Sequence, residues 1–229
     1  MPNYFRPFLK FVRIRAMTTL DRAGLIRCFR GAAEQVRANH ALLSQLDSVG
    51  GDGDHGTTML RAMTCLEQAM SASTVPQISG LLSEIGWAVM GVDGGATGPL
   101  FGTFFQGMSD PSAGKDLLDA ATMAAMLEAG LAGVQRQSKA KLGDKTMLDA
   151  LIPAVQAARR AADTGADLAG VLGAAATAAQ QGAEATQQWQ AKFGRARNIG
   201  AKSIGTADPG ATSVSLVFRG FLIGATTHA

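Results

Sequence analysis

Three aspartates lie within eight residues of one glycine-rich stretch, at positions 47, 52 and 54. Like charges this close raise each other's pKa unless a cation joins them. Oxygen ligands alone suit Mg²⁺ or Ca²⁺ rather than Zn²⁺, and a loop with few carboxylates suits Mg²⁺, which completes its shell with water and substrate phosphates. Asp47, Asp52 and Asp54 therefore predict a magnesium site that receives a phosphate-bearing substrate.

Three familiar metal- and nucleotide-binding loop motifs do not account for the predicted site. An EF-hand would need a ligand where Gly56 stands and a bidentate glutamate where Met63 stands. Residues 51–56 match the GxGxxG spacing, but no strand precedes them and their two carboxylates would repel a bare pyrophosphate. The pair Gly114-Lys115 lacks the upstream glycine of a P-loop. A nucleotide would therefore be held in another way.

Later glycine-flanked stretches offer that other way. Residues 94–98 with Thr97 let backbone N–H groups approach an anion ahead of a helix, although an ordinary interhelical turn explains this stretch equally well on its own. Arg195 can pair with a phosphate, and residues 208–210 form a tight turn before a helix. His55 has no visible base-orienting partner, so a hydrogen bond to phosphate is favoured over a nucleophilic role.

Helical periodicity surrounds these loops. Apolar residues recur at three- and four-residue spacing over residues 19–38, 116–134 and 145–162, and a bend is expected at Pro153. Residues 211–225 are rich in β-branched side chains and fit a helix or a strand, although no partner strand is evident. The segments together predict an all-α fold of about eight antiparallel helices.

Composition excludes several classes of function. The chain has 229 residues and a net charge of +3, but residues 1–16 carry four cations and no acid, so the remaining chain has no basic excess for nucleic acid. No window is long and apolar enough to span a membrane. The two cysteines form no metal-binding pattern and favour a cytoplasmic location. Residues 1–16 are interpreted as a basic extension, and residues 17–229 as one helical domain.

The ordered motifs resemble the L subunit of dihydroxyacetone kinase. The match consists of Leu46-Asp47 with residues 51–56, then residues 94–103, 143–147, 194–196, 203–205 and 208–213. The resemblance implies a closed helical barrel with a nucleotide site at one end. It also implies that ADP, or ATP when phosphorylated, is bound with two Mg²⁺ ions held by Asp47, Asp52 and Asp54, and that the chain has no catalytic nucleophile. The implied nucleotide-binding residues are His55, Gly56, Thr57, Thr58, Ala96, Thr97, Ser138, Met147, Arg195, Asp208, Pro209 and Gly210.

The resemblance also implies partner proteins. A separate K subunit would hold the keto-sugar on a histidine, and a phosphohistidine M subunit would rephosphorylate the bound nucleotide. Two alternatives stay open: a subunit of another keto-sugar kinase that exchanges its nucleotide with free ATP, and a non-enzymatic protein that reports nucleotide state to a transcription factor. The oligomeric state is also open, a homodimer included.

Overall fold

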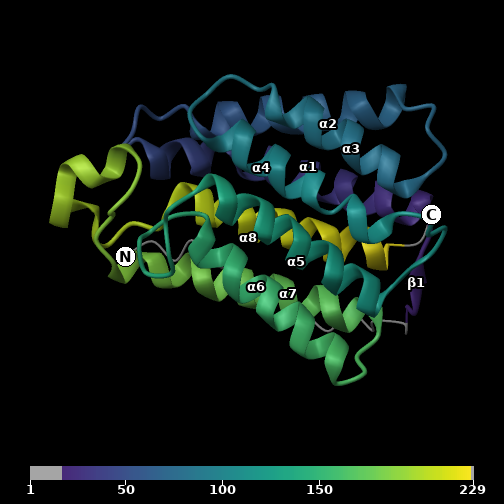
Figure 1. The fold of residues 1–229 in the computed structure, drawn as a ribbon. Coiled ribbons are helices and arrows are strands. Elements are labelled where there is room, and N and C mark those ends of the chain that lie inside the picture. Colours follow the sequence, from purple (N-terminus) through teal and green to yellow (C-terminus); the bar gives the residue numbers. More distant parts are fainter. Residues whose placement is uncertain (1–16, 228–229) are drawn as a thin grey trace.

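Eight α-helices dominate the protein in a computed structural model that describes residues 17–227 (Figure 1). The basic extension expected at residues 1–16 lies outside the described residues. Three short 3₁₀ segments, η1 (Asp110–Ser112), η2 (Thr186–Gln188) and η3 (Arg195–Ser203), lie in connections. The α-helices are α1 (Arg22–Asp47), α2 (His55–Ala72), α3 (Ile78–Met90), α4 (Thr97–Gly107), α5 (Ala120–Gln137), α6 (Leu148–Asp163), α7 (Leu168–Ala185) and α8 (Pro209–Thr226).

The predicted all-α class is confirmed, with some differences in detail. Helix α1 continues nine residues beyond the expected end at Ala38, because Leu43 and Leu46 extend its buried face. Residues 211–225, which fit either a helix or a strand by sequence, form part of helix α8. Two short strands, β1 (Thr19–Leu20) and β2 (Leu118–Asp119), pair antiparallel and were not predicted, since two residues are too few to show a period.

Aspartates begin four of the helices. Asp21, Asp119, Asp167 and Asp208 each accept a hydrogen bond from the backbone N–H three residues later, at 2.7–2.8 Å. A side-chain oxygen at this position satisfies one of the backbone donors that the first turn leaves unpaired. These caps fix where α1, α5, α7 and α8 begin.

The helices form a closed ring. Each helix packs against the next one along the chain, and α8 packs against α1, so that the last helix meets the first. The closure needs close contact between α1 and α8: a Cβ atom on Gly220 would lie 2.3 Å from Cα of Ala32, and one on Gly224 would lie 2.1 Å from the carbonyl oxygen of Arg27. Glycine is therefore required where these two backbones meet.

Aromatic side chains fill the interior of the ring. Phe29 of α1 packs edge-on against Phe105 of α4 and Phe221 of α8, with ring centroids 5.3 and 5.2 Å apart. Phe218 joins Phe104 to Phe221. Edge-to-face pairs of this kind add about 0.5–1.5 kcal/mol beyond the burial of their area. This rigid core leaves the loops at the ends of the ring free to build a site. Within residues 17–227, no helix combines the length and hydropathy needed to cross a membrane.

Candidate functional site

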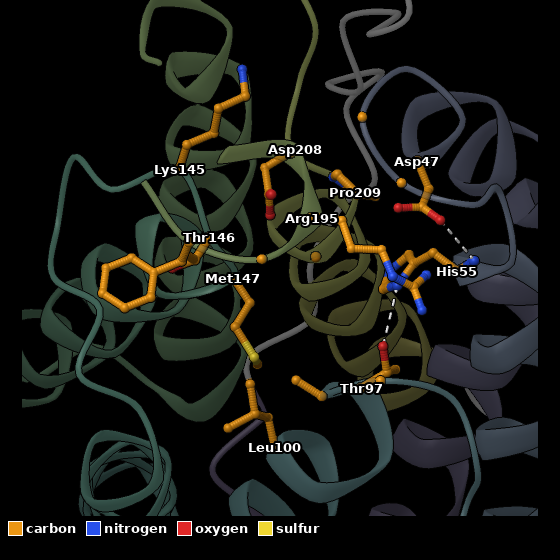
Figure 2. Close-up of a pocket in the computed structure, with 18 of the residues that line it drawn as sticks. Asp47, His55, Thr97, Leu100, Lys145, Thr146, Met147, Arg195, Asp208 and Pro209 are labelled. Carbon is orange, nitrogen blue, oxygen red and sulfur yellow. Dashed lines mark hydrogen bonds between the residues drawn. The ribbon is translucent and has the colours of Figure 1, made fainter. Parts of the chain in front are cut away.

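A cavity of about 400 Å³ opens at one end of the ring (Figure 2). The first residues of α2, α4 and α8, and the start of α6, all contribute to its wall. Since even-numbered helices begin here and α1 and α5 end here, odd and even helices run in opposite directions, as predicted. The positive ends of four helix dipoles thus converge on one cavity, which favours an anionic ligand.

The aspartate loop lies on one side of this cavity. Carboxylate oxygens of Asp47, Asp52 and Asp54 all lie within 4.8 Å of one another. Asp47 is fixed by the backbone: its Oδ2 accepts from the N–H groups of Gly53 at 3.0 Å and His55 at 3.4 Å. All three potential ligands in this cluster are carboxylate oxygens. A set of oxygen ligands fits Mg²⁺.

Glycines allow this loop to fold so tightly. A Cβ atom on Gly51 would lie 2.2 Å from Oδ1 of Asp47, and Gly53 has a φ of +77°, a left-handed conformation that side chains disfavour. The glycine-rich composition is therefore a geometric requirement of the carboxylate cluster.

The connection between α7 and α8 reaches across to the aspartates. Arg195, the first residue of η3, forms an ion pair with Asp52. The side chains remain 58% and 46% exposed, so this ion pair contributes little to stability. The same connection touches the loop at Gly50, where a Cβ atom would lie 2.9 Å from Cα of Ala196. A cationic guanidinium and the carboxylate cluster thus face one opening.

His55 lies at the start of α2 with both ring nitrogens engaged. Its Nδ1 lies 3.2 Å from Oγ1 of Thr97, and its Nε2 lies 2.8 Å from Oγ of Ser213. Burial lowers the pKa of His55 below its usual 6.5, against the opposing effect of the Asp47 carboxylate. The ring thus holds the hydroxyl groups of Thr97 and Ser213 in place around the cavity.

Apolar side chains lie opposite the aspartate loop, on a side of the cavity that also carries Thr146 and Asp208. Figure 2 shows Met147 and Leu100 across the opening from Asp47 and His55. Phe101, Phe193 and Ser138 also lie in the lining. A cavity with anion-attracting helix ends on one side and apolar side chains on the other matches a ligand that joins phosphates to a flat organic ring.

Most of the predicted residues meet in this cavity. Its lining includes Asp47, Asp54, His55, Ala96, Thr97, Ser138, Met147, Arg195, Asp208, Pro209 and Gly210. Asp52 joins from the exposed rim through the carboxylate cluster. Three predicted nucleotide-binding residues lie outside the lining: Gly56 is buried against the carbonyl oxygen of His40, Thr58 is buried, and Thr57 is exposed.

Several residues of the site were not predicted. Ser213 contacts His55, and Phe193 lines the cavity. Lys145 was noted only as part of a motif, yet it is 95% buried. A lysine among polar residues is expected to be exposed to solvent. The feature that sets Lys145 apart is the positive φ of its backbone, which the sequence does not show. Asp149 lies under the same loop, where its carboxylate accepts hydrogen bonds from backbone N–H groups.

Asp208 combines two functions at the cavity. It caps α8, and Figure 2 shows its carboxylate directed toward the opening beside Pro209. Burial raises the pKa of Asp208 to about 7, the negative charge of Asp149 adds to this rise, and the hydrogen bond from Ala211 and the charge of Lys145 oppose it. This carboxyl therefore changes protonation near neutral pH.

Comparison with known proteins identifies relatives along most of the chain. The DAK2 domain family matches residues 49–223. The ADP-binding subunit DhaL of PEP-dependent dihydroxyacetone kinase 1 from Listeria innocua is 34% identical over 89% of this chain and 97% of its own length. DhaL of PEP-dependent dihydroxyacetone kinase from Escherichia coli is 32% identical, over 88% and 96%.

A solved structure resembles the whole ring. The dihydroxyacetone kinase of C. freundii, in complex with AMP-PNP and Mg²⁺, aligns with a TM-score of 0.67 and 26% sequence identity over 96% of this chain. The aligned region is 37% of that longer chain, so this chain spans little more than a third of the solved protein.

Proposed function

The chain belongs to the DAK2 domain family, and from this membership and the geometry of the cavity we propose that it is the ADP-binding subunit of a dihydroxyacetone-type kinase. In this proposal the chain presents a magnesium-bound nucleotide, and a phosphoryl group passes through that nucleotide to a keto-sugar held by a separate K subunit. The relatives named ADP-binding subunits, which match nearly the full length of this chain, support this assignment.

One observation carries the proposal. The carboxylates of Asp47, Asp52 and Asp54 lie at the same cavity as the N-termini of α2, α4, α6 and α8, with an apolar wall opposite. Carboxylates attract a cation, whereas helix N-termini attract an anion. A ligand that suits both therefore contains an anion together with its cation. A nucleoside diphosphate with Mg²⁺ has this composition, and its base matches the apolar wall.

Each part of the cavity then has a role in holding the nucleotide. The three aspartates would hold two Mg²⁺ ions, which would neutralise charge on the phosphate oxygens. The backbone at Ala96 and Thr97 and the guanidinium of Arg195 contact the phosphates or ribose. His55 keeps the Thr97 and Ser213 hydroxyls in fixed orientations. Met147 and residues 208–210 enclose the nucleotide from the apolar side, with Ser138 near the base.

Phosphoryl transfer requires positioning and charge neutralisation more than a covalent intermediate on the protein. The site residues described above supply both, and the proposal assigns no nucleophile to this chain. The keto-sugar and its covalent contact are assigned to the K subunit. A phosphohistidine M subunit restores the nucleotide to ATP while it remains bound.

Reconstitution tests this function. The purified chain is mixed with a dihydroxyacetone-binding K subunit and a phosphorylated M subunit, and formation of dihydroxyacetone phosphate is followed with and without the chain. The proposal expects product only when all three are present. Product formation from free ATP without the M subunit would instead support the ATP-exchanging kinase. Failure in both assays, with K and M subunits of demonstrated activity, would contradict the kinase function.

A further inference from the structure

Lys145 contributes to the lining of the cavity, but the residue is 95% buried and its ammonium group is bonded to protein. Its Nζ lies 2.8 Å from the carbonyl oxygen of Thr186, 2.7 Å from that of Ser203 and 2.6 Å from that of Thr206. An ammonium group has three donors and no acceptor, so three carbonyl oxygens satisfy it completely. No donor remains for a phosphate. Figure 2 also shows the side chain directed away from Met147 and Leu100.

These three carbonyl groups belong to a single stretch of chain, residues 186–206. That stretch contains Arg195 and leads directly into Asp208, whose backbone N–H donates to Oγ1 of Thr186 at 2.8 Å. It consists of 3₁₀ turns and irregular chain, and internal hydrogen bonds such as those from Gly205 N–H to the Gln187 carbonyl oxygen and from Ala191 N–H to Oγ of Ser203 hold its shape. Its position relative to the 143–147 loop depends on external bonds: the three from buried Lys145, and those of the exposed Lys192 with Asp144.

The loop that presents Lys145 is itself held rigidly. Lys145 has a φ of +62°, the only non-glycine residue with a positive φ among residues 17–227. Such a conformation costs about 1–3 kcal/mol and persists only where its surroundings impose it. Asp149 imposes it here, because its Oδ1 accepts from Gly143 N–H at 2.5 Å and its Oδ2 accepts from Thr146 N–H at 2.7 Å. The anchored loop continues into Met147.

Charge supports the same arrangement. Burial lowers the pKa of Lys145, and the nearby carboxylates of Asp208 and Asp149 act in the opposite direction. A buried ammonium that lost its acceptors would be strongly unfavourable, so the group has one stable position. Lys145 thus connects the two walls of the cavity: the loop with Met147 and the stretch with Arg195.

We propose that Lys145 is a positioning residue of the nucleotide pocket, which binds residues 186–206 to the anchored 143–147 loop and thereby sets the place of Arg195 and Asp208 relative to Met147. The inference rests on the proposed nucleotide-binding function. Lys145 acts through these residues and does not touch the nucleotide.

A tryptophan reports on the stretch that Lys145 holds. The chain has two tryptophans, and Trp189 lies within residues 186–206 while Trp87 is 64% exposed on α3. In a Trp87→Phe background, acrylamide quenching of Trp189 fluorescence measures the mobility of this stretch. Lys145→Met removes the ammonium at similar length, and Lys141→Met makes the same change at an exposed lysine nearby. ADP affinity in the presence of Mg²⁺ is measured by calorimetry on the same proteins after any bound nucleotide has been removed.

The expected results distinguish positioning from general stability. Well below its unfolding midpoint, Lys145→Met should show about twofold stronger quenching of Trp189 and roughly tenfold weaker ADP binding, while Lys141→Met matches the parent. A purely structural role would lower the unfolding midpoint without changing either quantity. Parent-like quenching and affinity in folded Lys145→Met would overturn the inference.

A second variant covers loss of folding. If Lys145→Met does not fold, Lys145→Arg is measured, because it keeps the charge but presents its donors in a planar fork that three converging carbonyls do not match. Unchanged quenching and affinity in that variant would refute the proposal. If the parent protein binds no ADP, the proposed function fails, and the quenching comparison still decides whether Lys145 holds the stretch.

Discussion

The Nε2 atom of His55 and the Oγ atom of Ser213 lie 2.8 Å apart, which ties the first residue of α2 to α8. Thr97, the first residue of α4, meets the other ring nitrogen at 3.2 Å. One imidazole therefore links the starts of α2 and α4 to the first turns of α8. Because the ring is partly buried, its hydrogen bonds contribute to stability as well as to the shape of the cavity.

Ser213→Ala should destabilise the protein by about 1–3 kcal/mol, the cost of leaving a partly buried polar nitrogen without a partner. Urea unfolding measures the change. Ser215→Ala is the matched control, since that buried hydroxyl donates only to the Thr212 carbonyl oxygen within its own helix. Equal losses in the two variants would show that the His55 contact has no special role.

Arg195→Gln should weaken binding of ADP with Mg²⁺ by roughly tenfold to a hundredfold, because a charge-assisted contact to phosphate or ribose is lost. The unfolding midpoint should stay near that of the parent, since the ion pair with Asp52 is largely exposed. Calorimetry and thermal unfolding provide the two measurements. Arg197→Gln, an exposed neighbour on η3, should bind normally, and equal affinities for both variants would exclude a direct role for Arg195.

Asp208→Asn should change how stability depends on pH. The pKa of Asp208 in the folded protein is about 7, raised from its usual 3.8 by burial. The folded state therefore holds this proton more tightly than the unfolded chain, so the resulting stability is present below about pH 4 and lost as the pH rises through about 7. Asparagine keeps a capping oxygen without the charge.

The free energy of unfolding of Asp208→Asn, relative to the parent, should thus increase between about pH 4 and pH 8. Urea unfolding at several pH values tests this expectation. Asp21→Asn, at the exposed cap of α1, controls for loss of a capping carboxylate. Parallel curves for the parent and Asp208→Asn would contradict the raised pKa.

Gly220→Ala should destabilise the ring by about 1–3 kcal/mol or more, because the new Cβ atom would overlap the backbone of α1 at Ala32. Gly173→Ala in α7 is the matched control, since a Cβ atom there meets nothing within 4 Å. It should stabilise the protein by about 0.5–1 kcal/mol through helix propensity. Thermal unfolding compares the two, and similar effects would argue against close α1–α8 packing.

The sequence predicted the helical class well because amphipathic periodicity is a local property. It did not show where α1 ends, since Leu43 and Leu46 continue the buried face on a stretch that also contains polar residues. The assignment of residues 211–225 stayed open because β-branched residues suit strands, and only burial of the Val214 and Val217 side chains within the ring favours the helix.

The site was predictable where a motif lies within one loop, as for Asp47, Asp52 and Asp54. Contacts between distant segments were not: Ser213 lies 158 residues after His55, and the acceptors of Lys145 lie 41–61 residues after it. Neither pair shows a spacing pattern. The tertiary arrangement also places Gly56, Thr57 and Thr58 away from the cavity lining, and their role in nucleotide binding stays a prediction.

The nucleotide and metal content of the purified chain tests the central claim most directly. The chain is purified without added nucleotide and denatured, and released ADP and Mg²⁺ are quantified beside Asp52→Asn and the control Asp116→Asn, an exposed aspartate between α4 and α5. We predict near-stoichiometric ADP with Mg²⁺ in the parent and the control, and loss of both in Asp52→Asn. A parent protein that contains no ADP and does not bind added ADP or ATP with Mg²⁺ would contradict the account.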